Sequence, residues 1–135
     1  MKLNPYIMFA GNAEEALNFY KDCFNGEIKG LNRFGGSPME TTEEYKQKIM
    51  HASLAFGESV IMFSDGMPDE KFSTGGNVYL SVDVPEPEEL EKVFNKIAEG
   101  GSVTMPLQDT FWGARFGMLK DKFGINWMFN CEKKK

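Results

Sequence analysis

The chain contains a single histidine, His51, which stands in the alternating run IMHASLAF. Imidazole changes its charge near neutral pH, so His51 is the one candidate for proton transfer or for a titrating hydrogen bond to a ligand. The alternative is a half-exposed strand histidine that only packs against its neighbours. Ser53 follows two residues later, but no acidic partner and no strained nucleophile turn accompany it, so nucleophilic catalysis by serine is not expected.

A second group of candidates is rich in aromatic and sulfur-containing side chains. The stretch DTFWGARFGMLKDKFGINWMF is dense in aromatic residues and contains Trp112. Trp112 and Tyr79 each combine an apolar ring with a hydrogen-bond donor, a combination common in small-molecule pockets. Methionines can provide an adaptable apolar lining or can simply fill an interior, and both interpretations stay open. The methionines concerned are Met62, Met118 and Met128.

Two helices are expected to position these residues. In GNAEEALNFYKDCFNG apolar residues recur at helical spacing, and Asn12 with Glu15 forms the pattern of a capping box. PEPEELEKVFNKIAEGG predicts the second helix, with Pro87 in its first turn and acidic residues close behind it. Each helix is preceded by one predicted strand and followed by another.

A hairpin completes each half of the chain. The first hairpin is expected over IMHASLAF and SVIMFS, and the second over ARFGMLKD and INWMFN. The order strand, helix, strand, strand, strand therefore occurs twice, in modules 4–65 and 76–131 joined by the loop 66–75. We expect a single domain, 1–135, of the α+β class, with two curved mixed sheets around a cavity and one main helix for each module.

Two segments, 35–48 and 65–76, interrupt the repeated pattern. GGSPMETTEEYKQK and DGMPDEKFSTGG are rich in glycine, proline and charged residues. Such segments are typical of surface connections, and long ones often act as lids over a site, so both roles stay open. A short helix at 42–48 is expected within the first segment.

Alternation along the strands divides their residues between two faces of each sheet. The fully apolar sets are assigned to the face that packs on the helix: Ala52, Leu54, Phe56, Ile61, Phe63, Val78, Leu80, Val82, Leu119 and Trp127. The opposite face is expected to line a ligand-binding cavity: His51, Ser53, Met62, Asn77, Tyr79, Trp112, Phe116, Met118 and Met128. This division depends on the hairpin register, because a slip of one residue would exchange the two sets. The expected pairings are Phe56 with Ser59 and Asp121 with Ile125.

Composition limits the partners and the location. A net charge of −5 argues against binding to nucleic acid or to an anionic membrane surface. No apolar stretch approaches the ~20 residues of a membrane-spanning helix. The start of the chain, MKLNPYIMF, lacks the apolar region of a signal peptide, so a cytoplasmic location is expected. Cys23 and Cys131 lack metal-type spacing and are expected to be reduced and buried.

The doubled βαβββ unit resembles the vicinal oxygen chelate superfamily, which includes glyoxalase I, extradiol dioxygenases and the bleomycin- and fosfomycin-resistance proteins. The resemblance is carried by PYIMFAGNAEEALNFYKDCFNGE, IMHASLAFG, VYLSVDV and DTFWGARFGMLKDKFGINWM. Within the superfamily the chain looks most similar to the PhnB-like group. The resemblance implies two modules that curve around a cavity, and a homodimer.

In the metal-dependent members of this superfamily, His, Gln or Glu ligands come from the first and last strands of the modules. The corresponding positions in this chain look like Pro5, Met62, Asn77 and Met128. None of these residues is a plausible ligand for a divalent metal, which prefers imidazole, carboxylate or thiolate. Neither a metal nor another cofactor is therefore expected.

Three functions are compatible with the sequence. The leading one is metal-independent binding of a small apolar or aromatic molecule in the cavity. The second is a lyase- or dioxygenase-type enzyme, either with His51 as the base or with a metal held by other residues. The third is a structural domain whose cavity is filled by its own side chains. Members of the PhnB-like group have carried a ubiquinone-methyltransferase label, but no glycine-rich nucleotide motif occurs here, so methyl transfer is not expected.

Overall fold

The computed structural model describes residues 1–38 and 40–132. The chain divides into two compact units between Ser73 and Thr74. We call them the first and the second module and describe each by itself. Met39, in the predicted loop 35–48, lies outside the described residues.

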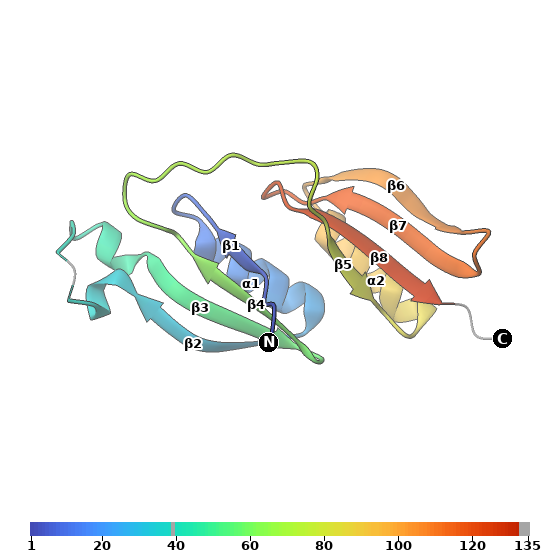
Figure 1. The fold of residues 1–135 in the computed structure, drawn as a ribbon, viewed down its shortest axis with the longest axis horizontal. Coiled ribbons are helices and arrows are strands. Elements are labelled where there is room, and N and C mark those ends of the chain that lie inside the picture. Colours follow the sequence, from blue (N-terminus) through green and yellow to red (C-terminus); the bar gives the residue numbers. More distant parts are fainter. Residues whose placement is uncertain (39, 133–135) are drawn as a thin grey trace. The chain divides into compact units, whose positions relative to one another are not determined.

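The first module is a four-stranded mixed sheet with α1 lying across one face (Figure 1). Its elements in chain order are β1 (Tyr6–Met8), α1 (Ala13–Phe24), β2 (Glu27–Arg33), the 3₁₀ turns η1 (Phe34–Gly36) and η2 (Tyr45–Gln47), β3 (Ile49–Phe56) and β4 (Ser59–Ser64). The strand order is β1-β4-β3-β2, with β1 parallel to β4 and the other pairs antiparallel. The short helix expected at 42–48 is the three-residue turn η2.

The second module repeats this arrangement. Its elements are β5 (Leu80–Asp83), α2 (Pro87–Ala98), β6 (Ser102–Asp109), β7 (Ala114–Lys120) and β8 (Asn126–Glu132). The strand order is β5-β8-β7-β6, and the only parallel pair in this sheet is β5 with β8. The doubled βαβββ order and the α+β class expected from the sequence are confirmed.

Each sheet buries one face against its own helix. In the first module Tyr20 of α1 packs on Phe63 of β4, with ring centroids 5.8 Å apart. In the second module Phe94 of α2 meets Phe129 of β8 edge-on at 5.6 Å. Most of the predicted helix-facing residues are buried: Ala52, Leu54, Ile61, Phe63, Leu119 and Trp127. Burying each large apolar side chain stabilises the fold by about 1.5–3 kcal/mol.

The hairpin registers are those predicted. Phe56 pairs with Ser59 in the first module, and Leu119 pairs with Trp127 in the second. The backbone N–H of Asp121 donates to the carbonyl of Ile125 at 2.8 Å, which closes the second hairpin. Gly124 has φ +86°, a left-handed conformation that side chains disfavour, so the turn needs glycine there.

The predicted capping box of the first helix is wrong. Asn12 makes no side-chain hydrogen bond to the helix. Instead Asp65, directly after β4, accepts from the backbone N–H of Ala13 at 2.8 Å and from that of Ile49 at 2.8 Å. Asp65 is only 2% exposed, so one buried carboxylate satisfies two N–H groups and places negative charge at the start of α1.

The strand expected from Asn77 begins only at Leu80. Val78 precedes it and is 70% exposed, so its assignment to the core is wrong. The physical reason is the side chain of Asn126, whose amide donates to the carbonyls of Gly75 and Val78 and holds this segment as a loop.

Phe56 departs slightly from its assignment, since it is half-buried and stacks on Phe24 at 4.2 Å. Both cysteines are free and buried as expected.

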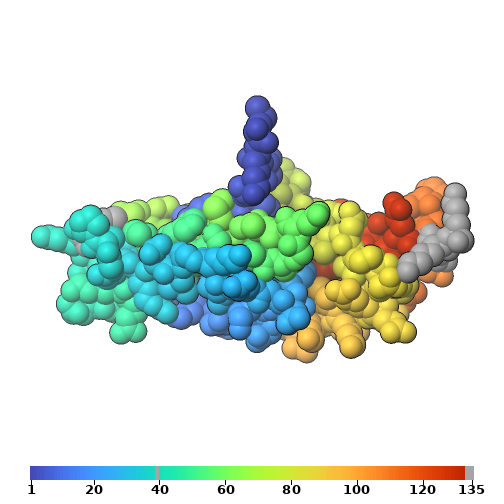
Figure 2. All heavy atoms as spheres, turned by 90° about the horizontal axis from the view of Figure 1, so that it is seen from below, coloured from blue at the N-terminus to red at the C-terminus, as the bar shows by residue number. Residues whose placement is uncertain are grey.

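The first residues of the chain stand clear of the first module, as the dark blue segment in Figure 2 shows, and Leu3 is accordingly exposed. Among the helices of the described ranges, none is long and apolar enough to cross a membrane.

Candidate functional site

The face of each sheet that is turned away from its helix carries most of the predicted site residues, and we call it the helix-free face. In the first module one row of directly paired residues crosses all four strands on this face. The row runs Tyr6, Met62, Ser53, Lys29 from β1 to β2. His51 lies two residues before Ser53 on β3, on the same side of the sheet, and pairs with Asn32 of β2. The predicted grouping of His51, Ser53 and Met62 is therefore what this sheet shows.

Tyr6 and His51 form a polar pair on this face. The phenolic oxygen of Tyr6 lies 3.0 Å from Nδ1 of His51, and the two ring centroids are 5.6 Å apart. His51 is half-buried, and no other hydrogen-bond partner of its ring lies within residues 1–38 and 40–132. The sequence prediction missed Tyr6, although alternation in PYIMF places it on the face opposite Ile7. The contact spans two strands and depends on the parallel pairing of β1 with β4.

The helix-free face of the second module is more apolar. Its equivalent row runs Ser81, Met128, Met118, Met105 from β5 to β6. Phe116 lies two residues before Met118 on β7, and it pairs with Gln108 of β6 and Asn130 of β8. The methionines and Phe116 are half-buried. The structure thus brings Phe116, Met118 and Met128 together as predicted, and adds Met105, which the sequence prediction did not include.

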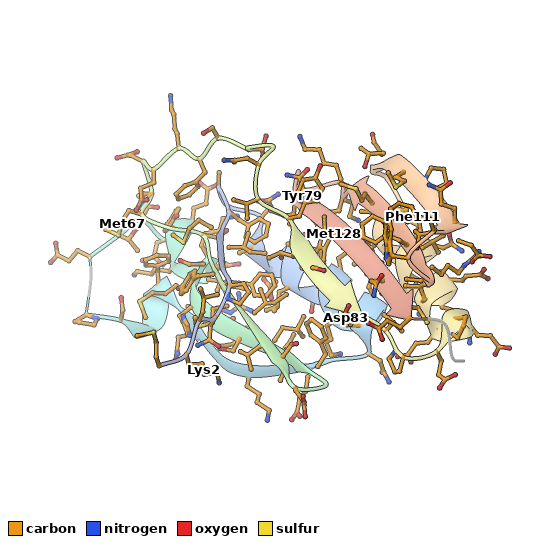
Figure 3. All side chains as sticks on the ribbon, turned by 45° about the vertical axis from the view of Figure 1, so that its right-hand side comes forward. Lys2, Met67, Tyr79, Asp83, Phe111 and Met128 are labelled. Carbon is orange, nitrogen blue, oxygen red and sulfur yellow. The ribbon has the colours of Figure 1, made fainter. Side chains whose placement is uncertain are left out.

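Trp112 lies in the short connection between β6 and β7 rather than on a strand. Its side chain is 55% exposed and meets the ring of Phe116 edge-on at 5.8 Å, so it adjoins the helix-free face. The ring of Phe111 meets that of Trp112 edge-on at 5.1 Å, and Phe111 is 98% exposed; Figure 3 labels it in this connection.

Asn77 and Tyr79 were expected on a strand of this face, but both precede β5. Tyr79 is half-buried and directly precedes β5, whose Ser81 pairs with Met128 of β8; Figure 3 labels Tyr79 and Met128. Asn77 is exposed in the loop held by Asn126. The structure therefore does not place Asn77 in the row of site residues.

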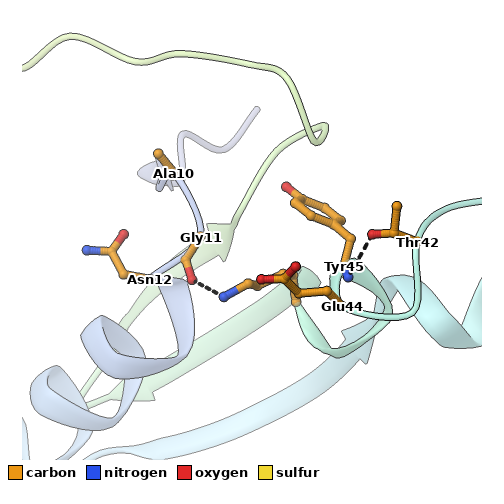
Figure 4. Close-up of a pocket in the computed structure, with 7 residues that line it drawn as sticks. Ala10, Gly11, Asn12, Thr42, Glu44 and Tyr45 are labelled. Atoms are coloured by element: carbon orange, nitrogen blue, oxygen red, sulfur yellow. Dashed lines mark hydrogen bonds between the residues drawn. The ribbon is translucent and has the colours of Figure 1, made fainter.

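A separate pocket of about 640 Å³ lies at the start of α1 (Figure 4). It is lined by Ala10, Gly11, Asn12, Thr42, Glu44, Tyr45 and Lys48. The ammonium of Lys48 donates to the carbonyl of Gly11 at 2.8 Å, and the N–H of Tyr45 donates to Oγ1 of Thr42 at 3.2 Å. These contacts use the pocket's own polar groups to hold the loop, so its geometry indicates a structural role.

Tyr45 anchors this loop to the end of β4. Its hydroxyl donates to the carbonyl of Gly66 at 2.6 Å and lies 3.3 Å from that of Asp65. Burial raises the pKa of Tyr45 above its ordinary value, and the negative charges of Asp65, Glu70 and Asp69 add to that increase. The tyrosine therefore stays a neutral donor at physiological pH.

The resemblance to metal-dependent proteins points to Pro5, Met62, Asn77 and Met128, and these residues supply no imidazole, carboxylate or thiolate. In the first module the carbonyl of Pro5 accepts the backbone N–H of Met62 at 3.0 Å, and the thioether of Met62 is a soft ligand. Asn77 and Met128 supply an amide and a second thioether. Across residues 1–38 and 40–132, no group of three or more His, Cys, Asp or Glu side chains is placed to hold a metal ion.

The repeated βαβββ order, with one helix on each four-stranded mixed sheet, defines the glyoxalase/bleomycin-resistance type of fold. The same fold occurs in the fosfomycin resistance protein FosX of Listeria monocytogenes, with a TM-score of 0.69 over 98% of this chain and 92% of that one. The identity is 12%, so this likeness concerns the fold alone.

The family model described as 3-demethylubiquinone-9 3-methyltransferase matches residues 1–129, and the chain belongs to this PhnB-like family. Protein PA1353 of Pseudomonas aeruginosa is 42% identical, with a TM-score of 0.89 over 99% of both chains. The PhnB protein of Bacillus cereus, a putative 3-demethylubiquinone-9 3-methyltransferase, is 30% identical, with a TM-score of 0.80 over 97% of this chain and 99% of that one. Protein YjdN of Escherichia coli K12 is 34% identical over 98% of this chain and 97% of its own length. The resemblance inferred from the sequence is confirmed.

Proposed function

We propose that the protein binds a small apolar or aromatic molecule at its helix-free sheet faces, without a metal ion. The observation that carries this proposal is the methionine row of the second module, Met105, Met118 and Met128, with Phe116 beside it. A sheet face that only meets water normally carries polar residues in these positions. An apolar face that the module's own helix does not cover is typical of a binding surface.

The side chains of this face suit a ligand that is flat or variable in shape. Methionine is flexible and polarisable, so a row of methionines can adapt to several apolar outlines. Trp112, in edge contact with Phe116, offers a half-exposed ring on which an aromatic ligand can pack. Desolvation of the ligand's apolar surface supplies most of the binding energy in such a site.

Metal independence is part of the proposal and rests on the donor set. Proline and methionine offer a hard or borderline divalent ion nothing, and a single asparagine amide competes poorly with water. No Lewis-acid step is therefore assigned to Pro5, Met62, Asn77 or Met128.

Methyl transfer, which the family's description names, is not carried over to this chain. Sites for nucleotide-type donors use a glycine-rich turn between a strand and a helix. The connection before α1 has one glycine, Gly11, and the connection before α2 contains Pro85 and Glu86. Neither connection therefore has the glycine-rich turn of a nucleotide site.

We also expect a homodimer in the cytoplasm. In the described residues β1 and β2 end one sheet, and β5 and β6 end the other. Sheet edges are commonly protected by pairing with a second copy. Light scattering at micromolar concentration should give about twice the 15.3 kDa mass of the chain. A single-chain mass under these conditions would contradict the dimer.

The binding proposal is tested by a calorimetric screen of small aromatic and carbonyl compounds, run with and without EDTA. Compounds that bind should do so equally in both conditions, and should bind more weakly to Trp112→Ala. Phe72→Ala is the control for loss of a part-exposed aromatic ring, because Phe72 is 37% exposed and lies in the loop after β4 of the first module. Binding that EDTA abolishes and one added metal restores would overturn the proposal.

A further inference from the structure

The contact between Tyr6 and His51 determines which atoms of the imidazole are available to a ligand. Nδ1 of His51 is engaged at 3.0 Å by the hydroxyl of Tyr6, whereas Nε2 has no hydrogen-bond partner in the part of the chain that the structure describes. A neutral imidazole carries one N–H and one lone pair, so the direction of the Tyr6 hydrogen bond fixes the character of Nε2.

The chemistry of the two groups sets this direction. Imidazole nitrogen is a good acceptor, whereas the oxygen of phenol is a weak one because its lone pair is delocalised into the ring. The O–H of phenol is also more acidic than the N–H of neutral imidazole, so it is the better hydrogen-bond donor. We infer that Tyr6 donates to Nδ1, holds neutral His51 with its proton on Nε2, and so presents this N–H to an acceptor oxygen of the ligand. This assignment rests on the proposed function, since it describes how the first module's face recognises what it binds.

The inference gives His51 a role as a donor rather than a base. In this tautomer the lone pair of Nδ1 is used by Tyr6, and Nε2 already carries a proton. Neutral His51 then has no free lone pair with which to remove a proton from a substrate. A ligand that offers only N–H groups finds no acceptor on this ring, whereas a ligand with a carbonyl oxygen does.

The neighbours of His51 favour a neutral carbonyl compound with an apolar body. Met62 and the ring of Tyr6 lie in the adjoining row and are apolar over most of their surface. Charges on this face include those of Lys29 and Glu27 on β2, where the ammonium of Lys29 lies 4.0 Å from the carboxylate of Glu27. Because the two opposite charges are close together, they offset each other's attraction for an ionic ligand.

The tautomer can be measured directly, because His51 is the only histidine. Long-range ¹H–¹⁵N NMR on histidine-labelled protein at about pH 8, where free imidazole is neutral, should show one protonated Nε2 and one unprotonated Nδ1. Tyr6→Phe removes the donor and should move both nitrogen shifts towards the tautomer mixture of free histidine. Ser53→Ala is the control and should leave them unchanged, because Ser53 lies on the same face but the described residues show no hydrogen bond between it and His51. Protonation of Nδ1 in the wild type, or no response to Tyr6→Phe, would overturn the inference.

The ligand class is tested with acetophenone, which has an acceptor oxygen, and benzylamine, which has donors only. Acetophenone should shift the Nε2 signal and bind about 2- to 10-fold more weakly to His51→Leu, while His51→Gln, which keeps a donor, should recover part of the loss. If acetophenone binds without affecting Nε2, or benzylamine binds as well at this ring, the donor assignment is wrong. If the tautomer is as inferred but no aromatic or carbonyl compound binds at either face, the proposed function fails instead.

Discussion

The two modules share one backbone plan but differ in the row of side chains that crosses the helix-free face. In the second module the row contains three methionines and Ser81. In the first module the strands at equivalent places in the order contribute Lys29, Ser53, Met62 and Tyr6. Only the fourth strand, β4 or β8, carries methionine in both rows. The two modules therefore share their fold and a helix-packed core, while the helix-free face is apolar in the second module and carries hydrogen-bonding groups in the first.

The neighbouring row shows the same difference. His51 of β3 and Phe116 of β7 both lie two residues before the row member of their strand, and they face Asn32 and Gln108. The equivalent position thus holds an imidazole in one module and a phenyl ring in the other. Because both positions belong to helix-free faces, the two modules differ in chemistry there without a difference in how their helices pack.

The connections before the third strand of each module also differ. In the first module a long loop with η1 and η2 is anchored by Tyr45 to the end of β4. In the second module residues 110–113 suffice and leave Phe111 exposed. This long loop is held next to Asp65. The buried carboxylate of Asp65 links α1 to β3 in the first module, because it accepts from the N–H groups of Ala13 and Ile49.

The largest expected effect separates core from face within the second module. Trp127 is 1% exposed, and its indole N–H donates to Oδ2 of Asp121 at 2.8 Å. Trp127→Ala should lower the free energy of unfolding by about 3–5 kcal/mol, because it leaves a cavity and removes the indole donor from Oδ2 of Asp121. Trp112→Ala should change it by less than about 1 kcal/mol. Denaturant unfolding of both variants checks this, and the opposite ranking would show that the faces are exchanged.

An intermediate effect tests the buried link that distinguishes the first module. Asp65→Ala should destabilise the protein by about 2–3 kcal/mol, since the N–H groups of Ala13 and Ile49 both lose their acceptor. Asn12→Ala is the control and should cost no more than about 0.5 kcal/mol, because the Asn12 side chain does not cap the helix. Equal losses in thermal unfolding would restore Asn12 as the cap.

The smallest effect concerns ion pairs that both modules make between the sheet and the helix. Arg33 contacts Glu14 at 2.6 Å, and Arg115 contacts Glu91 at 2.8 Å. The hydrogen bond from Arg33 lowers the pKa of Glu14 below its ordinary value of 4.5, which outweighs the opposing effect of partial burial. A lowered carboxyl pKa stabilises the fold above the unfolded value, and the contribution is lost as pH falls through the folded pKa.

Arg33→Gln should therefore reduce stability by about 0.2–1 kcal/mol at neutral pH, and the difference from the wild type should shrink in acid below the unfolded pKa of Glu14. Arg115→Gln is the matching variant in the second module. Thermal melts of Arg33→Gln over this pH range give the measurement. A difference that persists unchanged in acid would mean that the Arg33 side chain stabilises through packing, not through Glu14.

Sequence periodicity predicted the repeat, the helix-facing core and both hairpin registers, because these depend on residues close together in the chain. Turn chemistry at Gly124 and the adjacent strands fixed the pairing of Leu119 with Trp127. The features that were missed depend on long-range contacts. Asp65 caps a helix that begins 52 residues earlier, and Tyr6 reaches a histidine 45 residues away. The late start of β5 likewise depends on the side chain of Asn126, 48 residues beyond Val78.

The central claim, that the helix-free faces bind a small apolar molecule, is tested most directly by NMR of methionine methyl groups. A compound from the screen is titrated in EDTA into protein labelled with ¹³C at its methionine methyls. The account predicts shifts for Met118 and Met128 in the second module or Met62 in the first, and none for Met67, which is exposed in a loop. Shifts confined to Met67, with the face methionines unchanged at saturation, would contradict it.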